Sequence, residues 1–78
     1  MNKAQLRLEL QNSGVRTNSY SLDGPSDETY CLIGGDDSWS VYYFERGIES
    51  GKKTFATESD ACIYLLGLLR NDPTANQK

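Results

Sequence analysis

The pattern of apolar and polar positions predicts a helix near each end of the chain, with strands between them. Asn2 and Gln5 stand three residues apart in a capping-box arrangement, and Leu6 and Leu10 fall on one helix face. Gly14 is placed to end this helix at its C-terminal cap. Apolar residues in the same stretch also alternate with period two, so a strand is the competing interpretation. The helix is preferred because Gln, Arg, Glu and Leu form helices more readily than strands.

The middle of the chain predicts three or four strands joined by turns. Asn18–Leu22 indicates a short edge strand, and the Gly and Pro that follow it are typical of a loop. Thr29–Ile33 is rich in strand formers and leads into a glycine-rich turn. Ser38–Arg46 gives the clearest strand, and a weaker one extends from Gly47 to about Phe55, with an interruption near Ser50-Gly51.

The clearest strand carries large side chains on both of its faces. Trp39, Val41 and Tyr43 alternate with Tyr42 and Phe44, so the two groups point in opposite directions. One face should receive the two helices. The other face would then expose aromatic side chains to a protein partner, unless a loop or the aromatics themselves cover it.

The strongest helix prediction begins at Thr57. Asp60 follows it by three residues in a second capping-box pattern, and acids in the first turn suit the helix dipole. A wide apolar stripe comes next, with Leu65 and Leu69 on its inner face. The sequence Asn71-Asp72-Pro73 ends the helix, because the residue before a proline disfavours helical geometry.

Together these elements predict an α+β fold. We expect two layers: a helix, a three- or four-stranded antiparallel sheet and a second helix, with both helices on one face of the sheet. The 78 residues allow a single domain with a modest core, which we place at residues 1–73. Residues 74–78 are predicted to be a disordered C-terminal tail.

Composition argues against a membrane protein or an exported one. The longest apolar stretch is far shorter than the roughly 20 residues that a membrane span needs. The first residues alternate polar and apolar side chains and lack the apolar region of a secretory signal. We therefore expect a cytoplasmic protein that does not bind membranes.

Residues suited to catalysis or metal binding are sparse. The chain contains no histidine, so a Ser-His or Cys-His pair cannot form. Cys31 and Cys62 lie in apolar segments and are expected to be small core residues, too few for a disulfide framework or a zinc site. Asp36 and Asp37 lack the further oxygen ligands of a cation site, and pairing either with Glu45 for glycoside hydrolysis would require a cleft. We expect no enzymatic activity, no cofactor and no metal.

The net charge of −3 is unevenly distributed. Between Tyr20 and Ser50 there are seven acidic residues and one basic residue, so this stretch carries −6. Such a charge disfavours direct binding of nucleic acid, whose phosphates need clustered Lys and Arg. It favours a basic partner, although acids that merely keep loops soluble are the simpler interpretation. The seven acids are Asp23, Asp27, Glu28, Asp36, Asp37, Glu45 and Glu49.

The motif Trp-x-Val-Tyr-Tyr-x-Glu-Arg-Gly, at residues 39–47, is the most distinctive segment. Together with residues 20–22, 29–32 and 55–66, it resembles a group of small bacterial immunity proteins from polymorphic or contact-dependent toxin systems. The similarity covers nearly the whole chain. The resemblance implies a cytosolic protein that binds and neutralises one toxin domain, for example a basic nuclease, and it identifies no functional residues.

These observations predict a non-enzymatic protein-binding domain, an immunity protein for a basic toxin domain. Acidic side chains would accelerate encounter with such a partner, and aromatic side chains would anchor it. The alternative is a structural or regulatory homodimer that closes on the aromatic sheet face. The expected partner-binding residues are Asp36, Asp37, Trp39, Tyr42, Phe44, Glu45, Arg46 and Glu49.

Overall fold

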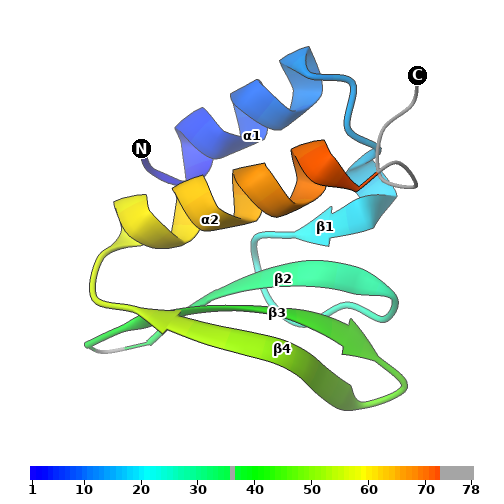
Figure 1. The fold of residues 1–78 in the computed structure, drawn as a ribbon, viewed down its shortest axis with the longest axis vertical. Coiled ribbons are helices and arrows are strands. Elements are labelled where there is room, and N and C mark those ends of the chain that lie inside the picture. The colour runs from blue at the N-terminus through cyan, green and yellow to red at the C-terminus, as the bar shows by residue number, and fades with distance from the viewer. Residues whose placement is uncertain (36, 73–78) are drawn as a thin grey trace.

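A computed structural model describes residues 1–35 and 37–72 and has an α+β fold (Figure 1). Asp36 and the tail predicted at residues 74–78 lie outside the described residues. In chain order the elements are α1 (Lys3–Asn12), the short 3-10 helix η1 (Thr17–Ser19), β1 (Tyr20–Ser21), β2 (Thr29–Gly34), β3 (Trp39–Glu45), β4 (Ile48–Phe55) and α2 (Glu58–Asn71).

The four strands form one mixed sheet in the order β1-β2-β3-β4. β3 pairs antiparallel with both β2 and β4, but β1 pairs parallel with β2. The expectation of a wholly antiparallel sheet is therefore wrong at its first strand. Residues 22–28 return the chain to the start of β2, so that Tyr20 lies opposite Tyr30. Because β1 has only two residues, this short return replaces the long crossover that parallel strands usually need.

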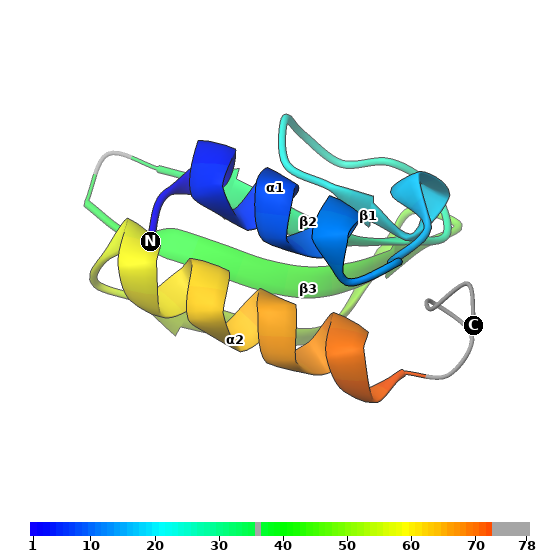
Figure 2. The same cartoon turned by 90° about the horizontal axis from the view of Figure 1, so that it is seen from above.

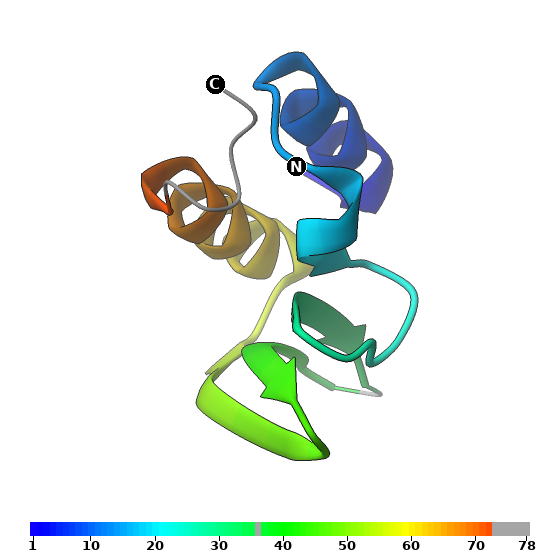
Figure 3. The ribbon, with the colours of Figure 1, turned by 90° about the vertical axis from the view of Figure 1, so that its right-hand side faces the viewer.

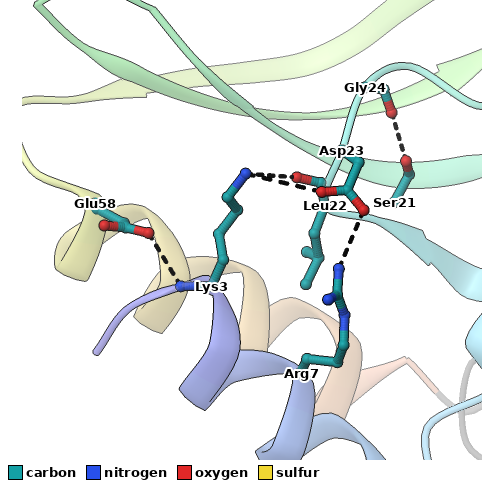
Figure 4. Close-up of polar contacts among 7 residues, drawn as sticks. All are labelled: Lys3, Arg7, Ser21, Leu22, Asp23, Gly24 and Glu58. Carbon is teal, nitrogen blue, oxygen red and sulfur yellow. Dashed lines mark hydrogen bonds and ion pairs between the residues drawn. The ribbon is translucent and has the colours of Figure 1, made fainter.

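Hydrogen bonds and ion pairs hold the return loop in place. Within the loop, the Thr29 hydroxyl donates to the Ser26 carbonyl at 2.6 Å. On the helix side, Lys3 Nζ donates to the Leu22 carbonyl at 3.2 Å, and Arg7 Nη2 lies 3.1 Å from a carboxylate oxygen of Asp23 (Figure 4). The loop is thus tied to α1 as well as to the strand that it precedes.

Both helices begin at the predicted caps. The Asn2 side chain accepts from the Gln5 backbone, and the Gln5 side chain accepts from the Asn2 backbone, each at 2.9 Å. This capping box confirms the helix and excludes the competing strand at residues 3–12. Gly14 follows the helix with a positive φ of 77°. At α2, Thr57 Oγ1 accepts from the Asp60 backbone at 3.1 Å.

The core lies between the helices and the sheet. In Figures 1 and 3 both helices are drawn on the same side of the sheet, and Figure 2 shows them side by side. The fully buried leucines of the helices share one cluster with two residues that pair across β2 and β3. These core residues include Leu6, Leu10, Leu32, Val41, Leu65 and Leu69.

The two helices run parallel and are joined at both ends. Near their N-termini, the Lys3 backbone N–H donates to Glu58 Oε2 at 3.0 Å (Figure 4). Near their C-termini, Arg70 Nη2 lies 3.3 Å from a carboxylate oxygen of Glu9. Glu58 therefore sits at the start of α2 while it accepts an otherwise unpaired N–H at the start of α1.

The hairpin between β3 and β4 departs from regular pairing at two places. The first is a shift of register between Val41 and Tyr43, opposite Gly51, whose φ is 63°. It lies where the sequence predicted an interruption of the strand. The turn itself places Arg46 at φ 51° and Gly47 at φ 80°, the combination of a type I′ turn. Only the glycine of this pair adopts that conformation without steric cost.

Candidate partner-binding site

The residues predicted to bind a partner do not form one patch. Asp37 lies in the β2–β3 hairpin, whereas Glu45 and Arg46 lie at the β3–β4 hairpin, at the opposite end of the sheet (Figure 1). β3 has seven residues, so its ends are roughly 20 Å apart at about 3.3 Å per residue. Asp36, the other acid predicted in the first hairpin, is outside the described residues.

Trp39 belongs to the helix-covered side of the sheet. It is half-buried and packs against the core cluster. Its ring also covers Gly34 on the neighbouring strand, where an added Cβ would lie 2.8 Å from Trp39 Cζ3. Much of this side chain is therefore engaged within the chain.

Tyr42, Phe44 and Glu49 come together on the other face, which we call the underside. The Tyr42 side chain is only 4% exposed, and its ring centroid lies 6.3 Å from that of Phe44. Lys52 Nζ lies 5.8 Å from the centre of the Tyr42 ring and 3.5 Å from Glu49 Oε1. Burial raises the pKa of Tyr42, and the neighbouring Cys31 thiol and Glu49 carboxylate raise it further. The Tyr42 ring thus packs against Phe44 and Lys52, and little of Tyr42 is exposed.

A different cluster forms where β2 begins, β3 ends and α2 ends. Tyr30 and Tyr43 pair across the strands on the helix-covered side, with ring centroids 5.0 Å apart and planes at 65°. The Tyr30 hydroxyl donates to Asp72 Oδ2 at 3.3 Å. Asp72 reaches this place because α2, with 14 residues at about 1.5 Å each, is about as long as the strands beneath it.

A hollow of about 370 Å³ opens over the tyrosine pair. Its other walls come from Arg16, from the η1 turn, and from Glu28 and Asp72. Glu28, which lines the hollow, has a φ of 58°, a conformation that non-glycine residues rarely adopt.

The electrostatic surroundings of this hollow are acidic. Burial is the main cause that raises the pKa of the Tyr43 hydroxyl, and four nearby carboxylates raise it further: Glu45, Glu28, Asp27 and Asp72. Burial also raises the pKa of Tyr30, followed by the charge of Asp72. We call these residues, Asp27, Glu28, Tyr30, Tyr43, Glu45 and Asp72, the acidic–aromatic end.

Two arginines accompany the carboxylates. The Arg46 backbone N–H donates to Asp27 Oδ1 at 2.7 Å, which ties the β3–β4 turn to the loop before β2. The contact that ties Arg46 to this loop is therefore made by its backbone. Arg16 is exposed at the rim of the hollow.

The described residues offer little for redox, metal or membrane chemistry. Cys31 and Cys62 are free and fully buried, Cys62 in the core cluster and Cys31 on the underside. Burial raises the pKa of the Cys62 thiol, and the Glu58 carboxylate adds to the rise. Within residues 1–35 and 37–72, no three acidic or cysteine side chains converge as a metal site would require. No helix in the same ranges has the length and apolar content to cross a membrane.

Sequence reasoning placed only Glu45 of this end among the binding residues. The pairing of Tyr30 with Tyr43 was available from the hairpin, because a turn centred between residues 35 and 38 sets that register. The position of Glu28 depends on the parallel return loop, which the local pattern does not predict. The position of Asp72 could be predicted only by knowing that α2 ends above this end of the sheet.

Comparisons of the chain with protein-family models, with curated proteins and with solved structures found no match. The function is therefore argued from the residues and contacts of the chain itself. Its resemblance to immunity proteins remains an expectation from the sequence.

Proposed function

We propose that this chain is a small non-enzymatic domain that binds a basic protein partner at its acidic–aromatic end. The observation that carries the proposal is the hollow over Tyr30 and Tyr43, with Glu28 and Asp72 in its walls and Asp27 and Glu45 near enough to raise the pKa of Tyr43. Tyrosine ring faces attract cations, and a nearby carboxylate strengthens that attraction. A Lys or Arg side chain of the partner is the group that best fits this combination.

The immunity-protein interpretation extends this proposal to the identity of the partner. An inhibitor needs no catalytic residues; it needs a complementary surface with a few well-buried anchors inside a polar rim. The acids would increase the rate of encounter with a basic toxin domain, such as a nuclease, and would repel nucleic acid. In this proposal the chain occupies the toxin's basic substrate groove.

The alternative is a homodimer that closes on the aromatic sheet face or its edge. β4 supports it, because this edge strand is exposed along nearly its whole length and Ile48 is 63% exposed. Against it, Gly51 interrupts the strand with a bulge, and Lys52 and Lys53 lie on the same edge. Bulges and lysines are the usual means by which edge strands avoid pairing with another chain.

The partner can be captured from the cells that naturally make this protein, and its binding kinetics measured at two salt concentrations. Replacing Glu28→Gln and Glu45→Gln together should slow association several-fold and flatten its salt dependence. The matched control is Asp36→Asn with Asp37→Asn, which removes the same charge from the segment between β2 and β3. Circular dichroism of each variant checks that it is folded.

Each outcome of this experiment decides between the proposals. A loss confined to the glutamate pair supports binding at the acidic–aromatic end. A loss confined to Asp36 and Asp37 would move the binding site to the β2–β3 hairpin. Recovery of the protein's own copies alone, in an assembly indifferent to salt and to both pairs, would replace the inhibitor with the homodimer.

The lifetime of the complex provides a second test of binding at the acidic–aromatic end. Tyr43→Leu should accelerate dissociation by the roughly 2 kcal/mol expected of an anchor, because it removes the ring face while leaving an apolar side chain. Phe44→Leu on the underside is the matched control. A faster dissociation for Phe44→Leu alone would place the anchors on the underside.

A further inference from the structure

A second hollow, of about 660 Å³, lies along the outer side of α2. Its walls are mainly apolar and come from Ile63, Tyr64 and Leu68. It also contacts Tyr30 and Asp72, which line the hollow of the acidic–aromatic end. The two hollows therefore adjoin at these two residues; one is apolar along the helix, and the other is acidic where the helix ends. We call the apolar part the α2 groove.

The α2 groove exposes apolar surface that the fold does not use. Ile63 is 57% exposed, although it lies on the same helix as the fully buried Leu65 and Leu69. Tyr64 is held on one side by the Phe55 ring, with centroids 5.2 Å apart, and its remaining surface lines the groove. Contiguous exposed apolar surface rimmed by polar residues is typical of an interaction site.

Gly67 forms part of the groove and is an unexpected residue for a helix interior. Glycine there costs about 1 kcal/mol relative to alanine. A Cβ built at Gly67 would meet no atom within 4 Å beyond its chain neighbours and the nearby helix backbone, so packing within the chain does not require a glycine. The missing side chain instead leaves room on the outer surface of α2 for the backbone of another molecule.

We infer that the α2 groove binds the apolar face of an amphipathic helix from the basic partner, with a Lys or Arg of that helix directed to Tyr30 and Asp72. This inference rests on the proposed function, because it assigns a second contact to the same partner. Charge decides the orientation: the groove is apolar along its length, and carboxylates lie at the end that it shares with the acidic hollow. Helix-in-groove recognition uses this arrangement of apolar anchors with flanking charges.

A second copy of the chain is a poorer occupant than a basic partner. The chain carries a net charge of −3, and each copy would bring Asp72 to the same interface. Like charges placed together across an interface disfavour association. Lys52 and Lys53, which could offset them, lie on β4 rather than along α2.

Two peptide probes separate the groove from the acidic hollow. The first is a synthetic amphipathic helix of about 18 residues, with leucines on one face and lysines on the other, long enough to span α2. The second is an oligolysine peptide, which has charge but no apolar face. Affinity for each is measured by fluorescence anisotropy of the labelled peptide, with the intact chain and its variants.

Gly67→Gln is the decisive variant because it fills the groove with a good helix former. Its affinity for the amphipathic peptide should fall roughly tenfold or more, whereas its affinity for oligolysine should not change. Its melting temperature should equal or exceed that of the natural chain, since glutamine favours the helix. If the variant binds the peptide more weakly although it is at least as stable, the loss comes from blocked access to the groove and not from damage to the fold.

A pair of exposed apolar residues supplies the control. Ile63→Gln should weaken binding of the amphipathic peptide. Leu8→Gln, which replaces a residue 60% exposed on α1, should leave that binding unchanged. Unchanged affinity in both Gly67→Gln and Ile63→Gln would overturn the groove proposal while leaving the proposed function intact. If neither peptide loses affinity in the Glu28→Gln, Glu45→Gln variant, the acidic hollow and the proposed function fail instead. If the chain self-associates and Gly67→Gln abolishes this self-association, the groove binds a second copy. That result would overturn the inference that it binds a helix of a basic partner.

Discussion

The two ends of the sheet use their charged residues differently. Where both helices begin, charges are paired within the chain: Asp23 lies 3.9 Å from Lys3 Nζ and 3.1 Å from Arg7 Nη2, and Glu58 accepts from the Lys3 backbone (Figure 4). We call this the tied end. At the acidic–aromatic end, Asp27 and Asp72 accept hydrogen bonds from the Arg46 backbone and the Tyr30 hydroxyl, but Asp72 and Glu28 also line an open hollow, and the φ of Glu28 is positive.

This difference indicates different roles for the two ends. Polar groups that pair within the chain hold a loop and two helices in position, so they contribute to the native structure. At the acidic–aromatic end, the positive φ of Glu28 carries a conformational cost, and this carboxylate lines an open hollow beside the tyrosine rings. This difference supports the proposed binding of a basic side chain at that end.

The largest expected effects on stability come from core residues, and they should be equally large beneath both ends of the sheet. Leu6 lies in α1 near the tied end, Leu69 lies near the acidic–aromatic end, and both are fully buried. Either Leu→Ala change should lower the free energy of unfolding by about 2–5 kcal/mol, as measured by chemical denaturation. Ile63→Ala, at an exposed position, should cost well under 1 kcal/mol. A much smaller loss for Leu69→Ala than for Leu6→Ala would mean that the ends differ in packing as well as charge.

Alkaline pH should destabilise the protein, in part through the two tyrosines of the acidic–aromatic end. The folded state raises the pKa of Tyr30, Tyr42 and Tyr43 above 10.0, and of Cys62 above 9.0. Between those values and the raised ones, the unfolded chain has lost protons that the folded chain keeps, so stability falls as pH rises. Denaturation midpoints from pH 8 to 11 measure the fall. Tyr30→Phe with Tyr43→Phe should flatten it, and an unchanged slope would contradict this assignment.

Removing the charge of Glu58 should weaken the tied end without affecting partner binding. Glu58→Gln should cost about 1 kcal/mol, because the carboxylate accepts from α1 and favours the dipole of α2. Asp60→Asn, in the same helical turn, loses only the dipole contribution and should cost less. The pKa of the Cys62 thiol should also fall in Glu58→Gln, since this carboxylate helps to raise it. Thiol alkylation rates against pH would detect an unaltered pKa and refute the contact.

The smallest effect is expected at the strained turn beside Glu45. Arg46→Gly should raise the free energy of unfolding by about 0.5–1 kcal/mol, because glycine tolerates the positive φ at this position. Arg46→Ala removes the same charge but keeps the strain, so it should bring no gain. Both variants retain the backbone N–H that Asp27 accepts. Equal stabilisation by both changes would identify charge, rather than conformation, as the cause.

The helices and hairpins could be predicted because local chemistry determines them. The capping pairs at Asn2 and Thr57, the period of the apolar residues and the bulge at Gly51 act over a few neighbouring positions. The direction of β1 could not be predicted, because two residues carry no periodic pattern. Its parallel pairing depends on how the Thr29 and Ser21 hydroxyls fix the return loop.

The candidate site was less predictable because distant segments assemble it. The sequence shows the surplus of acid in residues 20–50, but its expected anchors, Trp39, Tyr42 and Phe44, lie on both faces of the sheet, and the pattern does not decide between the faces. Tyr43 and Asp72 meet because a helix and a strand of similar length end at the same place. Gly67 attracts attention only when the space around it is known.

Because α1 packs beside α2, the chain cannot complete its core until α2 has been synthesised. The contacts that join Lys3 to Glu58 and Glu9 to Arg70 span 55 and 61 residues. At roughly 5–20 residues per second, α1 precedes its partner helix on the ribosome by several seconds. An isolated helix of ten residues is marginally stable in water, so α1 would spend that interval largely unfolded, with Leu6 and Leu10 exposed to chaperones. We therefore expect the domain to fold in one step after translation of α2, with the first helix among the last elements to become ordered.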